Sequence, residues 1–552
     1  MANSDSVSSS NEDPALIPIA IRILRRFPRP AFISRFTAYR LYIFGLTYLL
    51  YVTFHVVRKP LGVTKNVLYH SNCSNVERPP DRVFLPNNTG WCSWAPFDRK
   101  DHQEKFAGLD FSYRLAYALG MVFAGHLGER LEVRRFLTVV MLVSGLWVVF
   151  GGLAFFWQVH SYSYFVVAQV GAGIFQSAGW PAVLTLMGNW FGKKRRGLIF
   201  GIWNTDTAVG NILGAIIAGV WVTDSLWGFS FIVPGIILSC GGIVAYCFVV
   251  VRPEDIGLSA PNYTGGDEPD AATKATVLDP AASTAHLSQS FNESSNDQLD
   301  MLPALPSRED RKPITIWGAI LIPGVIEYAI CLFFCKSVYY AFFAWLPVYI
   351  KDSLHVKNNE AADLSALFDG GGIVGGISAG LASDLLGGSA TVCGAMFLLA
   401  IPAIFCLEHF IVTGGHVLLI ILLLVIGFLL NGPYTLIVTA VSADLGTRPS
   451  LVKDKKCLTT VAAVIDAMGA LGSACGPLIA GLLSKGREKN DWKPVFYYLI
   501  AAQLCAVLCL TRLIYREGAR WWTNRNTRRN TRFQLKTIGL VEAATFSRTS
   551  DS

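Results

Sequence analysis

The sequence predicts an all-α integral membrane protein with twelve transmembrane helices in two six-helix halves. Of its 552 residues, 52% are hydrophobic and only 16% are charged. That balance excludes an ordinary soluble enzyme. About twelve apolar segments are long enough to cross a bilayer core of about 30 Å. Motifs in the first half of the chain also recur in the second half.

The twelve spans follow from runs of apolar residues bounded by charged or turn-forming residues. We expect them near residues 39–59, 108–127, 136–156, 162–188, 198–221, 228–251, 318–350, 364–386, 389–409, 416–440, 458–484 and 494–514. The segments 162–188 and 318–350 are too long to stand upright in a bilayer, so we expect tilt or an interfacial first turn there.

Basic residues set the expected orientation. The N-terminal tail, residues 1–38, is rich in arginine and lacks the short apolar stretch of a cleavable signal peptide. Arginines flanking a first span favour a cytosolic N-terminus, and an even number of spans returns the basic tail 516–552 to the cytosol. The net charge of +8 is accounted for by this topology. We therefore expect no nucleic-acid partner.

The loop between the first two spans, residues 60–107, is then expected on the lumenal or extracellular side. It carries two glycosylation sequons, beginning at Asn72 and Asn87, and two cysteines, Cys73 and Cys92. On that side of a membrane, glycosylation and a Cys73–Cys92 disulfide are both expected.

Residues 252–314 are rich in Pro, Ala, Ser, Thr and Asp and predict a disordered cytosolic linker between the halves 39–251 and 315–515. Gly125 to Arg130 closes the second span, and Gly380 to Asp384 closes the eighth. Gly179-Trp180-Pro181 is matched by Gly432-Pro433, and the two offsets, 255 and 253 residues, nearly agree. Two repeated six-span halves resemble the layout of the major facilitator superfamily, in which the first and seventh helices lie beside a central cavity.

Lys336 is a charge in the middle of an apolar run. The next charge toward the C-terminus, Lys351, lies roughly 22 Å along a helix axis. A lysine at the centre of a span costs on the order of 3 kcal/mol. A second cationic step, Arg58-Lys59, ends the first span. Two cations in separate helices predict an anionic cargo; the alternative is that both are structural and pair with Asp206, Asp369 or Asp466.

Helical spacing places further polar groups beside these cations. They are Tyr51 and His55 with Arg58, and Tyr339 and Tyr340 with Lys336. Tyrosine hydroxyls beside cations suit phosphate oxygens. Asn204 lies on a polar face of the fifth span, and Asp206 points away from that face. For Asp466, both a role in specificity and a structural ion pair remain open.

The fourth, fifth and tenth spans contain the most specific motifs. These are Gly179-Trp180-Pro181, Asn189-Trp190-Phe191, Arg195-Arg196-Gly197, Trp203-Asn204 and Asn431-Gly432-Pro433-Tyr434. With Arg58-Lys59, they resemble the organophosphate:phosphate antiporters of the major facilitator superfamily. Within that branch the chain is most similar to the eukaryotic sugar-phosphate exchangers, solute carrier family 37, from about residue 39 to residue 516.

The resemblance implies a transporter, not an enzyme, that exchanges a sugar phosphate for inorganic phosphate by alternating access in the endoplasmic reticulum membrane. Glucose 6-phosphate is the expected substrate, and no cofactor or metal is expected. The alternatives are an antiporter of glycerol 3-phosphate or another organophosphate, a non-transporting sensor, and a carrier of neutral sugars. Lys336 argues against a neutral cargo, which would leave the cation unpaired.

The resemblance also assigns residues. Arg58, with Lys59 beside it, takes the place of the first-helix arginine that binds phosphate, and Lys336 that of the seventh-helix cation. Tyr117 and Tyr434 match motif positions of the family. Met121 departs from the family, because bacterial carriers have a lysine there. The span-closing motifs imply gating residues, namely Gly125, Glu129, Arg130 and Asp384.

Overall fold

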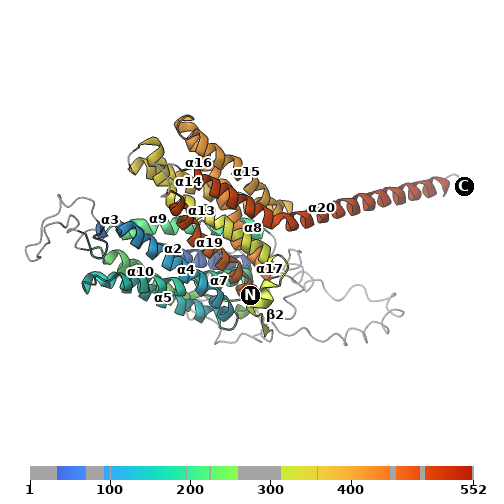
Figure 1. Cartoon of the computed structure of the whole chain (residues 1–552). Coiled ribbons are helices and arrows are strands. Elements are labelled where there is room, and N and C mark those ends of the chain that lie inside the picture. The colour runs from blue at the N-terminus through green and yellow to red at the C-terminus, as the bar shows by residue number, and fades with distance from the viewer. Residues whose placement is uncertain are drawn as a thin grey trace, which may run out of the picture.

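The computed structural model describes residues 34–69, 93–99, 101–192, 195–222, 226–258, 312–356, 358–447, 455–484 and 492–549. The chain in these ranges is helical apart from two short strands (Figure 1). The predicted all-α membrane fold is confirmed.

The first group of helices precedes residue 258. It comprises α2 (Arg35–Val56), α3 (Pro60–Leu68), α4 (His102–Gly128), α5 (Val133–Phe156), α6 (Tyr162–Gln176), α7 (Gly179–Trp190), α8 (Arg196–Trp203), α9 (Asp206–Gly219), α10 (Phe229–Phe248) and the 3₁₀ turn η1 (Glu254–Ile256).

The second group follows residue 312. It comprises β1 (Lys312–Pro313), α12 (Ile316–Ile320), α13 (Val325–Leu354), α14 (Asn358–Leu386), α15 (Ser389–Phe410), α16 (Gly415–Leu436), the π-helical turn η2 (Ile437–Val441), α17 (Ser442–Gly446), β2 (Lys455–Lys456), α19 (Leu458–Ser484) and α20 (Lys493–Thr549). Strands β1 and β2 pair in parallel.

Ten helices within the described ranges are long and apolar enough to cross a membrane. The other two predicted spans correspond to α4 and to the pair α8–α9. Helix α4 contains charged residues, among them Asp110 and Arg114, and α8–α9 is interrupted after Trp203. The charged residues of α4 and the break in α8–α9 lower the mean hydropathy of these two spans. Both still occupy their expected places in the helix bundle.

Three predicted spans are broken helices. Pro60, which cannot donate a backbone hydrogen bond, begins α3 and ends the first α-helix at Val56. The segment predicted at 162–188 divides into α6 and α7. The segment predicted at 318–350 divides at Gly324, whose φ of 104° is accessible to glycine, so the short helix α12 takes the place of a long tilted helix. The last helix, in contrast, extends well beyond the predicted 514.

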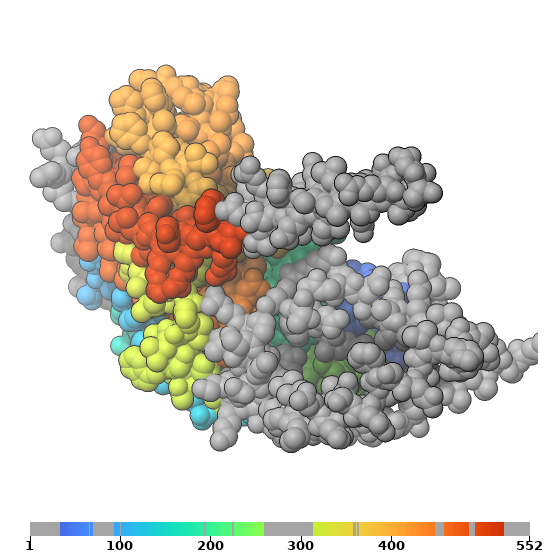
Figure 2. Space-filling view, turned by 90° about the vertical axis from the view of Figure 1, so that its right-hand side faces the viewer, coloured from blue at the N-terminus to red at the C-terminus, as the bar shows by residue number. Residues whose placement is uncertain are grey.

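Within each group the helices pack in pairs. In the first group α5 packs on α10 and α2 on α9, and in the second α13 packs on α19 and α14 on α16. On α14, Gly371 and Gly375 allow this close packing, because a Cβ at either position would collide with the backbone of α16. The second group forms a contiguous yellow-to-red body in the space-filling view (Figure 2).

The two groups meet through α4 against α19 and α8 against α14. These contacts join one end of the bundle, where α8 and α19 begin and α4 and α14 end. We call it the closed end and define it by Glu129, Gly197, Asp384 and Thr459.

Candidate functional site

A cavity of about 620 Å³ lies between the two groups of helices. Its lining extends from Asp466 and Thr435 to Leu61 and Asp110 near the other end of the bundle. All eleven substrate-binding residues predicted from the sequence line it: Tyr51, His55, Arg58, Lys59, Tyr117, Asn204, Lys336, Tyr339, Tyr340, Tyr434 and Asp466. They lie around one cavity, and substrate binding by them stays a prediction.

Arg58 and Lys59 lie in the break between α2 and α3, which directs both side chains into the cavity. The Arg58 Nε donates to Gln176 Oε1 at 3.4 Å, and its guanidinium carbon lies 5.4 Å from the centre of the Tyr117 ring. The Arg58 Nη2 is buried without a hydrogen-bond partner in the described structure. A buried, unpartnered guanidinium nitrogen is costly unless a ligand accepts from it.

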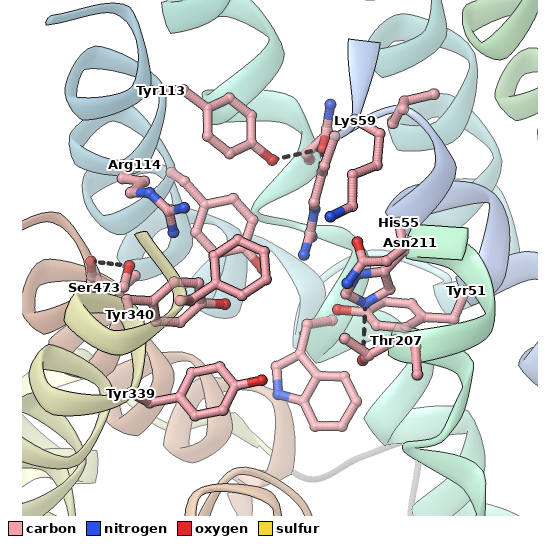
Figure 3. Close-up of a pocket in the computed structure, with 18 of the residues that line it drawn as sticks. Tyr51, His55, Lys59, Tyr113, Arg114, Thr207, Asn211, Tyr339, Tyr340 and Ser473 are labelled. Atoms are coloured by element: carbon pink, nitrogen blue, oxygen red, sulfur yellow. Dashed lines mark hydrogen bonds between the residues drawn. The ribbon is translucent and has the colours of Figure 1, made fainter. Parts of the chain in front are cut away.

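The same glutamine oxygen also accepts from Tyr113. The Tyr113 hydroxyl donates to Gln176 Oε1 at 2.6 Å, and Figure 3 shows Tyr113 directed into the cavity. Gln176 is nearly inaccessible to solvent. It is therefore placed to hold Tyr113 and Arg58 in fixed orientations.

Lys336 differs from the expectation of an unpaired cation. Its Nζ forms an ion pair with Asp466 Oδ1 and lies 4.9 Å from the centre of the Tyr434 ring. Both side chains of the pair are less than one-tenth exposed. The expectation that Lys336 is a lone cation is wrong, because packing of α13 on α19 brings Asp466 against it. The structural alternative for Asp466, an ion pair, is confirmed.

Aromatic rings form one wall of the cavity. The Tyr51 ring lies 5.6 Å from the Trp180 ring and 5.2 Å from the Trp203 ring, and Tyr339 lies 5.3 Å from Tyr434. Such rings offer an apolar face and a polar edge, which suits the two sides of a sugar ring.

A polar cluster lies behind Tyr51. His55 Nε2 is 3.2 Å from Thr207 Oγ1 and 3.8 Å from Asp206 Oδ2 (Figure 3). Asp206 is fully buried and does not line the cavity. Asp206 thus lies against His55 of α2 and points away from the polar face of the fifth span, as expected. Asn204, by contrast, faces the cavity and donates to Thr435 Oγ1 of the second group at 3.1 Å.

Sequence reasoning missed Arg114, which lines the cavity from α4. Its guanidinium carbon lies 4.5 Å from the centre of the Tyr340 ring (Figure 3). A signal was present, since Arg114 is a charge inside the predicted span 108–127 and lies one turn before Tyr117. Lys336 was selected because it is a charge within an apolar span, and the same criterion applies to Arg114.

Three carboxylates of the described chain join the groups at the closed end; Asp444 pairs with Arg196 at 2.9 Å, and the other two bind backbone nitrogens. Glu129 Oε1 accepts from the backbone nitrogens of Thr459 and Thr460 at 2.6 and 3.2 Å, at the start of α19. Asp384 accepts from Gly197 and Leu198 nitrogens at 2.9 and 2.8 Å, at the start of α8. Glu129 and Asp384 thus each satisfy free backbone donors at a helix N-terminus.

The remaining predicted gating residues differ in their contacts. Gly125 packs against α19, and its carbonyl oxygen accepts from Thr460 Oγ1 at 3.3 Å. Arg130 is exposed beside this contact. A gating role for these residues stays a prediction.

The predicted glycosylation sites and cysteines, Asn72, Asn87, Cys73 and Cys92, lie outside the described residues. Most of the linker 252–314 does as well. Within the described ranges no three His, Cys, Asp or Glu side chains are placed to hold a metal ion.

The comparisons agree with the fold and the cavity. The model of the Major Facilitator Superfamily matches residues 104–452, and the chain belongs to this superfamily of multi-pass membrane transporters. The glucose-6-phosphate exchanger SLC37A2 of Bos taurus is 46% identical over 483 residues, which cover 88% of this chain and 95% of that protein. SLC37A2 of Homo sapiens is 46% identical over 488 residues, covering 88% and 94%. The glucose-6-phosphate exchanger SLC37A1 of Homo sapiens is 42% identical over 529 residues, covering 91% and 97%. The chain is a member of solute carrier family 37, as its motifs predicted.

Proposed function

We propose that this protein exchanges a sugar phosphate, in the first place glucose 6-phosphate, for inorganic phosphate across a membrane. The observation that carries this proposal is Arg58, a cavity guanidinium with a buried nitrogen that has no protein acceptor within the described structure. Phosphate oxygens accept several charge-assisted hydrogen bonds and match the fork of an arginine. The relatives named glucose-6-phosphate exchangers support the choice of substrate.

The cavity offers different surroundings to the two parts of such a substrate. Arg58 and the hydroxyls of Tyr113 and Tyr117 would face the phosphate group. The rings of Tyr51, Trp180 and Tyr339 would contact the sugar. The phosphate contacts are charged and strong, and the sugar contacts are weaker and set specificity.

Alternating access would proceed by opening the closed end and closing the other. When the cavity closes around its cations, water leaves them, which costs several kcal/mol per uncompensated ion. A bound phosphate dianion cancels this charge. Loaded transporters therefore interconvert, and empty ones do not.

We place the protein in the endoplasmic reticulum membrane, with the closed end and both termini facing the cytosol. The basic residues Arg35, Arg134, Arg135 and Arg195 lie at the closed end, in agreement with the distribution of positive charge around membrane spans.

Exchange in liposomes tests the function. Purified protein in vesicles loaded with phosphate should take up labelled phosphate and glucose 6-phosphate, and Arg58→Gln should abolish both. Absence of uptake by the wild-type protein that nevertheless binds glucose 6-phosphate would instead indicate a sensor.

A further inference from the structure

Among the described residues four cations line the cavity, and two of them face a carboxylate. Lys336 is paired with Asp466, and Lys59 lies within electrostatic reach of Asp369. A third lining carboxylate, Asp110, is paired with Lys65 at 2.9 Å. Within the described ranges neither Arg58 nor Arg114 faces a carboxylate of the cavity lining; Asp206, which is within electrostatic reach of Arg58, lies outside that lining. Two guanidinium groups that face no lining carboxylate match the two negative charges of one phosphate dianion.

Arg114 belongs to the first group and contacts the second. Its 4.5 Å approach to the Tyr340 ring joins α4 to α13 across the cavity (Figure 3). The side chain is only partly buried, so it can turn toward a ligand in the cavity. A ring face is a weaker partner for a guanidinium than a phosphate oxygen, which also accepts hydrogen bonds.

The two arginines face the same space. Tyr113 on α4 and Tyr340 on α13 both line the cavity (Figure 3). Each of these phenols is within electrostatic reach of both Arg58 and Arg114. An anion located between the two phenols is therefore accessible to both guanidinium groups.

We propose that Arg114 is a second phosphate-binding residue that acts with Arg58. This inference rests on the proposed function and changes the expected pair of phosphate-binding cations from Arg58 and Lys336 to Arg58 and Arg114. In the empty cavity the Arg114 guanidinium packs against the face of the Tyr340 ring. A bound phosphate accepts from Arg58 and Arg114 together, while Lys336 remains paired with Asp466.

The competing explanation is that Arg114 only bridges the two groups through Tyr340. In that case, replacing Arg114 should lower the stability of the protein and leave its affinity for phosphate unchanged. Binding therefore has to be measured apart from stability.

The experiment titrates purified full-length protein with inorganic phosphate and records the thermal unfolding midpoint. In Arg114→Gln the half-saturating phosphate concentration should rise on the order of 10- to 100-fold, as expected for a lost charge-assisted hydrogen bond. Arg114→Lys should show a smaller rise, because lysine keeps the charge without the fork. Arg99→Gln is the matched control, since Arg99 is exposed, lies outside the cavity lining and carries the same charge.

The outcomes separate the two proposals. An unchanged half-saturating concentration in Arg114→Gln, with only a lower midpoint in the absence of phosphate, overturns the inference and leaves the proposed function standing. An equal rise of the half-saturating concentration in Arg99→Gln also overturns it. The effect would then come from a general electrostatic attraction between phosphate and a basic protein. If Arg114→Gln does not fold, Arg114→Lys decides: wild-type affinity overturns the inference. A wild-type protein that neither responds to phosphate or glucose 6-phosphate nor exchanges them contradicts the proposed function itself.

Discussion

At the residue scale, a buried ion pair changes the expected role of Lys336. Removing water from two charges is expensive, and their mutual attraction offsets this cost only while both are present. Lys336 and Asp466 satisfy that condition between α13 and α19. Arg58 differs, because its buried Nη2 has no hydrogen-bond acceptor in the described structure and is available to a ligand.

Lys336→Ala should therefore destabilise the protein by about 3–5 kcal/mol, because it leaves the Asp466 carboxylate buried and unpaired. The double variant Lys336→Ala/Asp466→Ala should recover most of this loss. Thermal unfolding of the three proteins in detergent measures both effects. A single variant as stable as the wild type would show that the pair contributes no stability.

Arg58→Gln should behave differently from Lys336→Ala. It removes a charge that forms no ion pair within the described residues, so expression and the unfolding midpoint should stay near wild type while exchange is lost. Uptake of labelled phosphate, normalised to the amount of protein in the vesicles, measures this. Substantial exchange by Arg58→Gln would remove Arg58 from the binding site.

At the element scale, two helix N-termini hold the closed end together. The starts of α8 and α19 belong to different groups, and each donates backbone hydrogen bonds to a carboxylate of the other group. Such interactions are worth about 0.5–2 kcal/mol each. They are strong enough to favour one conformation and weak enough to break in each transport cycle.

Glu129→Gln and Asp384→Asn should each populate the conformation opened at this end by a factor of roughly 5, since about 1 kcal/mol is lost. Cys457 is a native reporter, because it is buried beside the start of α19. Its rate of maleimide labelling, read by peptide mass spectrometry, should rise in both variants.

The matched control is Asp101→Asn, at the opposite end of α4, where the carboxylate pairs with Lys105. Equal labelling of Cys457 in the wild type, the control and both variants would argue against a gating role for the carboxylates.

At the scale of the whole molecule, uncompensated cavity charge predicts obligatory exchange. Vesicles preloaded with phosphate should take up labelled glucose 6-phosphate rapidly, and empty vesicles should take up almost none. The membrane potential is clamped in both. Equal uptake into empty and loaded vesicles would indicate a uniporter.

Topology makes a separate prediction. If the closed end faces the cytosol, the loop with Asn72 and Asn87 lies in the lumen and carries glycan, and Cys73 and Cys92 meet oxidising conditions. Glycosidase digestion of protein from a eukaryotic host should increase its gel mobility, and Asn72→Gln/Asn87→Gln should match the digested form. Unchanged mobility would count against this orientation.

The sequence alone determined the class of protein, the positions of the spans apart from their breaks and the far end of α20, and eleven of the residues that line the cavity. Those features depend on local composition and helical spacing, which a sequence displays directly. The motifs around Trp180, Trp203 and Tyr434 also predicted the family that the comparisons show.

Only the tertiary structure decided which charges are balanced. Lys336 and Asp466 are 130 residues apart, and three carboxylates were equally available as partners until the packing of α13 on α19 selected one. The same holds for Arg114, whose importance became visible when α4 and α13 met across the cavity. Charge balance depends on distances between helices, and helix packing in three dimensions sets those distances.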